Sequence, residues 1–125
     1  MKGEGAITRL KLKLQLYCGE EIALGPGKAD LLEQIGATGS ISGAARSLGM
    51  SYRRAWLLVA TMNRCFHEPL VQTHPGGGNK AGAELTAAGR TVLAAYRDLC
   101  ESAQAAAAGE ALERLESALR DPGAP

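Results

Sequence analysis

The sequence of 125 residues is poor in aromatic residues and has no long apolar run. One tryptophan, one phenylalanine and three tyrosines leave a core that has to be built from aliphatic residues. The apolar runs are far shorter than the roughly 20 residues needed to span a bilayer. The charged start, MKGEGAITRLKLKL, lacks the apolar centre of a secretory signal. We therefore expect a cytoplasmic protein with one modest core.

Cysteine is also scarce, and its pattern gives little support to metal or enzyme chemistry. Cys18, Cys65 and Cys100 are scattered and odd in number, which fits reduced, buried thiols better than a disulfide framework. Cys65, His67 and His74 are near one another in sequence, but their spacing matches no known ligand pattern. No nucleophile with a base and no acid–base pair is recognisable. Neither an enzyme, nor a metal site, nor a cofactor site is expected.

The net charge of +1 hides a strong asymmetry along the chain. Between Ser40 and Arg90 there are six basic residues and only two acidic ones, Glu68 and Glu84. After Arg90, acidic residues outnumber basic ones. A basic centre beside an acidic tail predicts one surface that faces nucleic acid. The six basic residues are Arg46, Arg53, Arg54, Arg64, Lys80 and Arg90.

Residues 38–63 have the pattern of two helices joined by a tight turn. A first helix is expected from about Ile41 to Leu48, where Ser40 or Ser42 can cap the free N–H groups of its first turn. Gly49 follows, and glycine adopts the left-handed conformation past a helix end without steric cost. A short helix, a glycine turn and a longer helix form a helix-turn-helix, whose second helix enters the DNA major groove with its N-terminus first.

The second helix is expected to begin after Ser51, which can cap it, and to continue to about Phe66. Its first turn carries hydroxyl and guanidinium groups, which suit base edges and phosphates. Trp56 has apolar neighbours and is expected to be a packing residue, with a stacking platform as the alternative. We predict that the major groove is contacted by Ser51, Tyr52, Arg53 and Arg54, and that Ser40, Ser42 and Arg46 position the first helix on the DNA backbone.

The segment ahead of the helix-turn-helix predicts a strand or hairpin and a bracing helix. In RLKLKLQL, residues Arg9 to Leu16, leucine alternates with polar residues, as in a half-buried strand. Glu21 to Leu24 can pair back as a second strand. The sequence GPGK at residues 25–28 lacks the glycine spacing and the Ser or Thr of a phosphate-binding loop. We therefore expect it to open a helix from about Lys28 to Ala37.

Pro69 is expected to stop the second helix. Two short strands are then expected to flank a glycine-rich loop. These strands are Leu70 to His74 and Ala83 to Leu85. A nucleotide-binding glycine loop is the rival interpretation, but the segment lacks the fingerprint spacing and the following βαβ pattern. Two strands around a basic loop form a "wing", which predicts contacts with the DNA backbone or minor groove through Gly77, Gly78 and Lys80.

A long helix is expected to follow, capped by Thr86 and interrupted near Gly109. Its apolar residues follow the spacing of a helix that packs along another helix. The alternative is that this helix packs back on its own domain, although three helices and a wing leave little surface to cover so long a stripe. We predict a dimer whose contacts are Val92, Tyr96, Leu99, Ala103, Leu112, Leu115 and Leu119.

Six short motifs occur in the helix-turn-helix and after the glycine-rich loop: Gly39-Ser40-Ile41-Ser42, Ala44-Ala45, Gly49-Met50-Ser51-Tyr52, Ala55-Trp56, Met62-Asn63 and Leu85-Thr86. These motifs closely resemble the N-terminal domain of the molybdate-responsive regulators of ModE type, which is akin to the winged helix-turn-helix of LysR-type regulators. The resemblance extends from about Leu10 to about Ala105. It implies DNA binding, pairing through the long helix, and a position of Trp56 on the core side of its helix. Family members carry C-terminal molybdate-binding domains, and no strand-rich segment follows the helix here, so molybdate is implied only by those domains.

The sequence thus predicts a mainly α protein with a small β component. Residues 1–90 would form a winged helix-turn-helix with an N-terminal strand or hairpin, residues 91–120 a dimerisation helix and residues 121–125 a flexible tail. The expected function is regulation of transcription by a homodimer on a palindromic double-stranded operator. Three accounts of effector sensing stay open: none at all, sensing through a partner protein, or a truncated larger regulator. The competing function is a winged helix that docks a protein partner.

Overall fold

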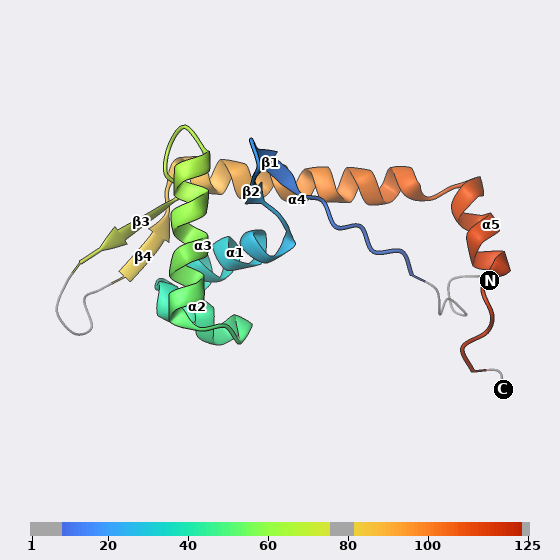
Figure 1. The fold of residues 1–125 in the computed structure, drawn as a ribbon, viewed down its shortest axis with the longest axis horizontal. Coiled ribbons are helices and arrows are strands. Elements are labelled where there is room, and N and C mark those ends of the chain that lie inside the picture. The colour runs from blue at the N-terminus through green and yellow to red at the C-terminus, as the bar shows by residue number, and fades with distance from the viewer. Residues whose placement is uncertain (1–8, 76–81, 124–125) are drawn as a thin grey trace. The chain divides into compact units, whose positions relative to one another are not determined.

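The computed structural model describes residues 9–75 and 82–123, which fall into two compact units. One unit is Lys13–Arg97, and the other combines the segment up to Leu12 with the residues from Asp98 onward. The elements follow one another as two strands, three helices, two strands and two helices (Figure 1). They are β1 (Leu16–Cys18), β2 (Glu21–Leu24), α1 (Pro26–Thr38), α2 (Ile41–Leu48), α3 (Tyr52–Cys65), β3 (Val71–His74), β4 (Gly82–Leu85), α4 (Ala87–Ala107) and α5 (Glu110–Ala118).

The core of the Lys13–Arg97 unit is aliphatic, as the scarcity of aromatic residues predicts. Helix α1 buries one complete face, and α2 and α3 pack against it through small residues. Ala44 and Ala55 are fully buried, so the helix backbones approach closely. The expected helix at about Lys28 to Ala37 is confirmed as the longer α1, which Pro26 opens. The buried residues of the three helices are Ala29, Leu31, Leu32, Ile35, Ile41, Ala44, Ala45, Ala55, Val59 and Met62.

The predicted helix-turn-helix is confirmed, including its caps. The Ser40 hydroxyl accepts a hydrogen bond from the Gly43 N–H at 2.9 Å, at the start of α2. Gly49 ends α2 in the left-handed conformation with φ of 68°. The Ser51 hydroxyl then accepts from the Arg54 N–H at 3.1 Å. Helix α3 begins there and ends at Cys65, one residue before the expected end.

The two strands expected after α3 are present as an antiparallel pair. Val71 pairs with Leu85 and His74 with Gly82, so β3 and β4 form the base of the wing. Pro69 was expected to end the helix, and this is wrong. Helix α3 has already ended at Cys65, and Pro69 lies in the connection to β3. Leu70, expected at the start of the strand, precedes it and is fully buried.

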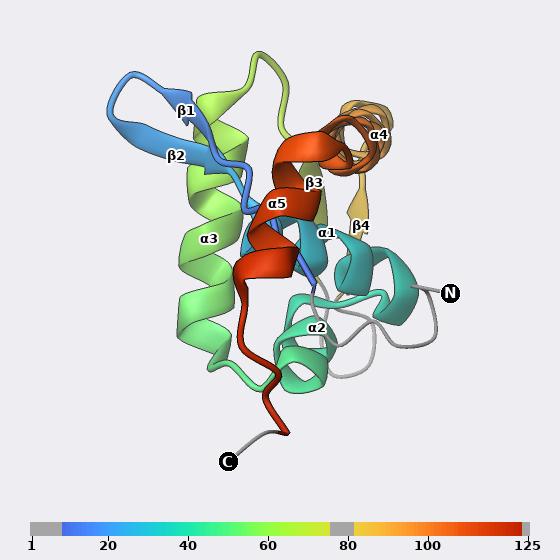
Figure 2. The same cartoon turned by 90° about the vertical axis from the view of Figure 1, so that its right-hand side faces the viewer.

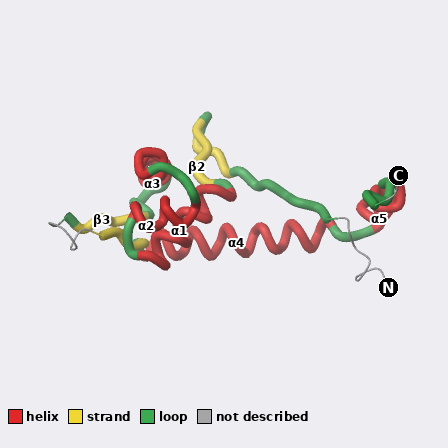
Figure 3. The backbone as a smooth tube through the Cα atoms, turned by 90° about the horizontal axis from the view of Figure 1, so that it is seen from below, coloured by secondary structure: helices red, strands yellow, loops and turns green. Residues whose placement is uncertain are grey.

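The N-terminal strand predicted at Arg9 to Leu16 is wrong, and a shorter hairpin replaces it. Residues 9–15 have no regular secondary structure (Figure 3), because a strand needs a backbone partner and only Leu16–Cys18 pair with β2. In the Lys13–Arg97 unit, the Leu14 carbonyl instead accepts a hydrogen bond from the Tyr96 hydroxyl at 2.8 Å. The expected hairpin itself is confirmed as β1–β2, which lies beside α3 in Figure 2.

Helix α4 begins at a tightly fitted junction. The Thr86 hydroxyl donates to the Pro69 carbonyl at 2.7 Å and accepts from the Gly89 N–H at 2.9 Å, which confirms Thr86 as the cap. A Cβ at Gly89 would lie 2.1 Å from the Leu70 carbonyl oxygen, so no side chain fits there. The Arg97 guanidinium binds Asp30 and Glu33 of α1, at 3.0 and 2.6 Å.

The interruption predicted near Gly109 is confirmed in the second unit. Helix α4 ends at Ala107, and Gly109 precedes the first residue of α5. Helix α5 buries none of its residues. Within the described residues, no helix combines the length and the apolar character required to cross a membrane.

Candidate nucleic-acid interface

The start of α2, the start of α3 and the base of the wing surround one open hollow of about 340 Å³. The wing base is held there by two sets of hydrogen bonds. The Ala83 N–H of β4 donates to the Gly39 carbonyl, between α1 and α2, at 2.9 Å. Asn63 of α3 binds the start of β3. The hollow is lined by Ser40, Ile41, Ser42, Tyr52, Trp56, Thr73, His74, Pro75, Gly82 and Ala83.

Three arginines of the helix-turn-helix are exposed and form no ion pair within the described part of the chain. They are Arg46 of α2 and Arg53 and Arg54 of α3. Among the described residues of this unit, the other arginines have an ion pair or donate a side-chain hydrogen bond: Arg64, Arg90 and Arg97. Arg53 and Arg54 lie in the first turn of α3 and Arg46 in the last turn of α2. Their unpaired guanidinium groups offer donors to phosphates and base edges.

The two neighbouring arginines of α3 lie on different sides of the helix. Arg53 shares a shallow depression with Tyr52, Trp56 and Leu57. A second depression involves Arg54, together with Ser51 and Leu58, and Arg53 borders it too. Successive residues of a helix point about 100° apart, so the side chains of Arg53 and Arg54 point in different directions from the helix axis. Arg53 therefore adjoins the residues of the hollow, whereas Arg54 is turned away from them.

The serines have different environments at this site. Ser40 and Ser51 use their hydroxyl oxygens as helix caps. Ser42 is exposed and lines the hollow without a capping role. The expected backbone contacts Gly77, Gly78 and Lys80 lie outside the described residues.

The expectation that Trp56 packs in the core is wrong. Its side chain is 50% exposed, and it lines the hollow. The core side of α3 is formed by Ala55, Val59 and Met62, which lie at helical spacing. Trp56 follows Ala55 and is therefore turned about 100° away from the core. The sequence contained this signal, because the buried spacing starts at Ala55 and leaves position 56 on the flank.

Asn63 belongs to one of the motifs named above, but its role as a positioning residue was not predicted. Its Oδ1 accepts from the Leu70 and Val71 N–H groups at 2.8 and 3.1 Å, and its Nδ2 donates to the Val71 carbonyl at 3.1 Å. These bonds fix the start of β3 against the last turns of α3. The available signal was an asparagine inside a helix, since asparagine favours caps and turns unless its amide has another partner.

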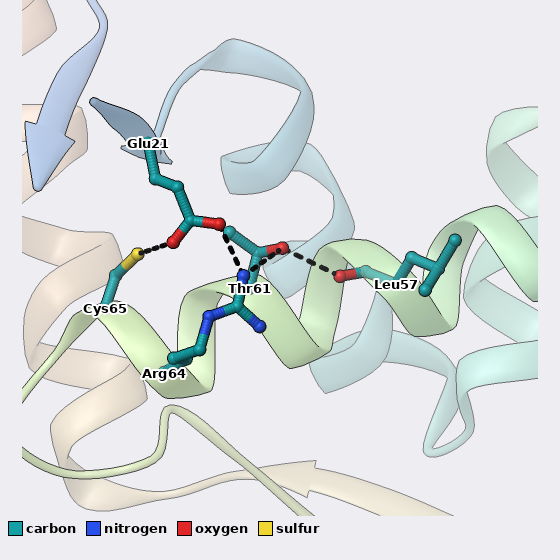
Figure 4. A network of polar contacts seen from close by, with 5 residues as sticks. All are labelled: Glu21, Leu57, Thr61, Arg64 and Cys65. Atoms are coloured by element: carbon teal, nitrogen blue, oxygen red, sulfur yellow. Dashed lines mark hydrogen bonds and ion pairs between the residues drawn. The ribbon is translucent and has the colours of Figure 1, made fainter. Parts of the chain in front are cut away.

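A polar network at the end of α3 gives one arginine of the basic centre an acidic partner within the same unit (Figure 4). The Arg64 guanidinium binds the Glu21 carboxylate of β2 and also donates to the Thr61 hydroxyl, at 3.5 Å. The hydrogen bond from Arg64 lowers the pKa of Glu21. The Cys65 thiol lies 3.5 Å from the same carboxylate, and burial raises the pKa of this thiol. Arg64 is therefore an anchor between α3 and the hairpin.

The cysteines were expected to be buried, and this is wrong for Cys18, which is exposed. Cys65 and Cys100 are half-buried, and all three are free thiols. Among the described residues, no group of three or more His, Cys, Asp or Glu side chains is arranged to hold a metal ion.

The residues predicted for dimerisation differ in exposure. Tyr96 is buried within the Lys13–Arg97 unit, where its hydroxyl binds the Leu14 carbonyl. Leu99, Leu115 and Leu119 are more than half exposed in the other unit. Half-buried residues make up the rest of the set: Val92, Ala103 and Leu112.

Comparison with known proteins agrees with this geometry. The family model of bacterial regulatory helix-turn-helix proteins of the lysR family matches residues 28–90, half of the chain. The chain is 48% identical over 73 residues to the molybdenum-pterin-binding protein MopB of Rhodobacter capsulatus, covering 58% of the chain and 27% of that relative. It is 37% identical over 114 residues to the molybdenum transport protein ModE of Azotobacter vinelandii, covering 91% of the chain and 40% of the relative.

The DNA-binding transcriptional dual regulator ModE of Escherichia coli strain K12 is 35% identical over 97 residues, which cover 78% of the chain and 36% of the relative. The chain thus spans well under half the length of these relatives. The matched family segment runs from the start of α1 into α4 and includes the helix-turn-helix and the base of the wing. The chain therefore belongs to the bacterial regulatory helix-turn-helix proteins of the lysR family and carries a ModE-like helix-turn-helix region.

Proposed function

We propose that this protein is a sequence-specific, double-stranded DNA-binding regulator of transcription. The observation that carries this proposal is the set of three exposed arginines on α2 and α3, which are free of ion pairs in the described chain and of which Arg53 adjoins residues of the hollow. Family membership adds support, because a regulatory helix-turn-helix places its second helix in the major groove. Such a protein acts where bacterial DNA is, in the cytoplasm.

Each part of the interface has a distinct task in this proposal. Arg53 and Arg54, with Tyr52 and Ser51, enter the major groove at the start of α3, and Arg53 is placed to bind guanine bidentately. Ser42 and Arg46 of α2 contact phosphates, joined by the backbone around Ser40. The wing residues Gly77, Gly78 and Lys80 contact the backbone or the minor groove.

We further propose that the protein acts as a homodimer. The support is in the second unit, where α5 buries no residue and three leucines are more than half exposed: one in α4, one in α5 and one directly after α5. A second copy would cover these apolar side chains. Of the predicted contacts, Leu99, Leu115 and Leu119 have the most surface to offer. A twofold dimer recognises a palindromic operator with half-sites about one or two helical turns apart.

Selection of binding sites from random duplex DNA tests the proposal, with each selected duplex measured again at two salt concentrations. We expect a palindromic motif, whose affinity falls steeply with salt as counterions are released from phosphates. Arg53→Ala should lose the motif, whereas the matched control Arg120→Ala removes an equal charge from outside the Lys13–Arg97 unit and should retain it. A failure to enrich any motif would contradict sequence-specific binding.

The second candidate is a winged helix that docks a protein partner through its apolar stripe. The exposed leucines of α4 and α5 favour it, since they suit any apolar partner. The salt series separates the two functions, because docking of an apolar surface depends weakly on salt.

Analytical sedimentation tests the homodimer. The wild type should sediment as a dimer, and Leu115→Glu, which places a charge in the exposed leucine surface, should sediment as a monomer. A wild type that sediments as a monomer contradicts the homodimer.

A further inference from the structure

The start of α3 exposes a cluster of large apolar side chains on the side of the proposed DNA contact. Tyr52, Trp56 and Leu57 are 55%, 50% and 48% exposed, whereas the large apolar residues of the core side of the same unit, such as Leu32 and Met62, are fully buried. Single exposed apolar residues are ordinary on a protein surface, but adjoining ones indicate a contact site. The roles assigned above to arginines and hydroxyl groups leave this apolar surface unused.

The position of Trp56 relates it to the DNA-contacting elements. Tyr52 and Trp56 are four residues apart and therefore neighbours along one side of α3. Both line the hollow, together with Ser42 of α2 and Thr73 of the wing base. Arg53 adjoins the same two aromatic residues in the neighbouring depression. The indole thus adjoins α2, the wing base and Arg53, the arginine proposed to bind a guanine base.

The chemistry of the major groove identifies what this surface suits. Among the base edges exposed there, thymine alone carries a methyl group, and an apolar side chain distinguishes it by contact with that methyl. The nearby charge favours DNA over an apolar protein partner, because Arg53 adjoins Tyr52 and Trp56 and has no acidic partner in the described chain. An indole ring offers a broad apolar face at little conformational cost.

We propose that Trp56 is a specificity-determining residue that packs against the C5-methyl group of a thymine in the major groove, with Tyr52 beside it. This inference rests on the proposed DNA-binding function. It predicts that each half-site contains a thymine near the base contacted by Arg53. Guanidinium and indole then recognise neighbouring bases by different means, a bidentate hydrogen bond and an apolar contact.

Deoxyuridine tests this assignment, because it differs from thymidine only by the absence of the methyl group. In the selected duplex, each thymine is replaced singly by deoxyuridine, and the affinity of the full chain is measured. Wild type should lose about fourfold in affinity at one position of each half-site, the value expected for one buried methyl group. Trp56→Ala should bind the thymine duplex more weakly and lose nothing more on replacement at that position.

The matched control is Tyr17→Ala, which removes an equally exposed aromatic side chain from β1. This variant should keep the full sensitivity to deoxyuridine. The proposal is overturned if wild type tolerates every replacement, or if Trp56→Ala remains as sensitive as wild type.

Photochemical crosslinking of the wild type provides a second measurement that does not depend on the folding of a variant. With 5-iododeoxyuridine at the sensitive position, the iodine takes the place of the methyl group, and irradiation should join that base to Trp56. Peptide mapping by mass spectrometry identifies the residue, and a crosslink confined to other residues overturns the proposal. If the wild type enriches no duplex at all, both the proposed DNA-binding function and the assignment of Trp56 fail. If a motif is enriched but Trp56 neither crosslinks to it nor affects its sensitivity to deoxyuridine, only the assignment of Trp56 fails.

Discussion

The two ends of α3 carry the same kind of residue in opposite surroundings. At the N-terminal end, Arg53 and Arg54 are exposed and make no ion pair within the described residues, whereas at the C-terminal end Arg64 is bound to Glu21. The C-terminal end also carries Asn63, whose amide makes three hydrogen bonds to the start of β3. The C-terminal end of α3 is therefore fixed to β2 and β3, whereas the arginines at its N-terminal end are available to bind DNA.

This difference explains why the charge of the segment alone does not locate the site. An exposed ion pair contributes little to stability, but it satisfies both charges and removes an arginine from the set available to phosphates. Of the six basic residues in the centre of the sequence, Arg64 and Arg90 are hydrogen-bonded to other parts of the unit. The free arginines of this centre lie only on α2 and the start of α3 within the described residues.

The largest expected effect is on DNA binding at the free end of α3. Arg53→Ala should weaken the specific site by about 1–3 kcal/mol and relax its sequence preference, because a bidentate contact with a base is lost. Competition between the selected duplex and unrelated DNA measures both effects. Arg64→Ala is the control within the same helix, and an equal loss there would contradict the distinction between the two ends.

A smaller effect is expected on stability when the anchored end is altered. Asn63→Ala should lower the free energy of unfolding by about 1–2 kcal/mol, because it leaves two N–H groups and one carbonyl at the start of β3 without their partner. Urea denaturation measures this change. Gln72→Ala removes an exposed amide from β3 and should be nearly neutral. Equal stability of the two variants would show that Asn63 does not hold the wing base.

A change in the wing should be weaker still and independent of sequence. Lys80→Ala is expected to reduce binding to all duplexes about equally and to lower the salt slope by about 1, since one phosphate contact is lost. Binding to the selected and to unrelated duplexes over a salt series checks this. A loss confined to the selected duplex would mean that Lys80 contacts a base.

The smallest effect concerns the pH dependence of the anchored end. The pKa of Glu21 is lowered in the folded protein by the hydrogen bond from Arg64, so this contact stabilises the fold at neutral pH. That contribution is lost as the pH falls through the folded-state pKa, where the carboxylate becomes protonated. Glu21→Gln should therefore lower Tm slightly at pH 7 and not at pH 2. A difference that persists unchanged at pH 2 would exclude the carboxylate charge as the cause.

Local patterns were sufficient for the helix-turn-helix, because its signals lie within a few residues of one another. Ser40, Gly49 and Ser51 each act on the turn in which they occur, and all three have the predicted role. The predicted N-terminal strand failed for the opposite reason. Alternation of leucine with polar residues is local, but a strand also needs a partner, and β2 pairs only with Leu16–Cys18.

The errors at the candidate site have the same physical origin. Trp56 has apolar neighbours in sequence, yet the direction of its side chain depends on which face of α3 meets α1 and α2. The pairing of Arg64 with Glu21 joins residues 43 positions apart, and no local spacing indicates it. Position within an element was thus predictable from the sequence, whereas the tertiary partner of each side chain was not.

The most direct test of the central claim is the NMR spectrum of the arginine side chains during titration with the selected duplex. The Nε–Hε signals report each guanidinium separately, and single Arg→Lys variants assign them. We predict that the signal of Arg53 shifts strongly on binding, while that of Arg64 stays where it is in the free protein. A shift of Arg64 with none at Arg53 would contradict the proposal that the N-terminal end of α3 reads DNA while its C-terminal end anchors the helix.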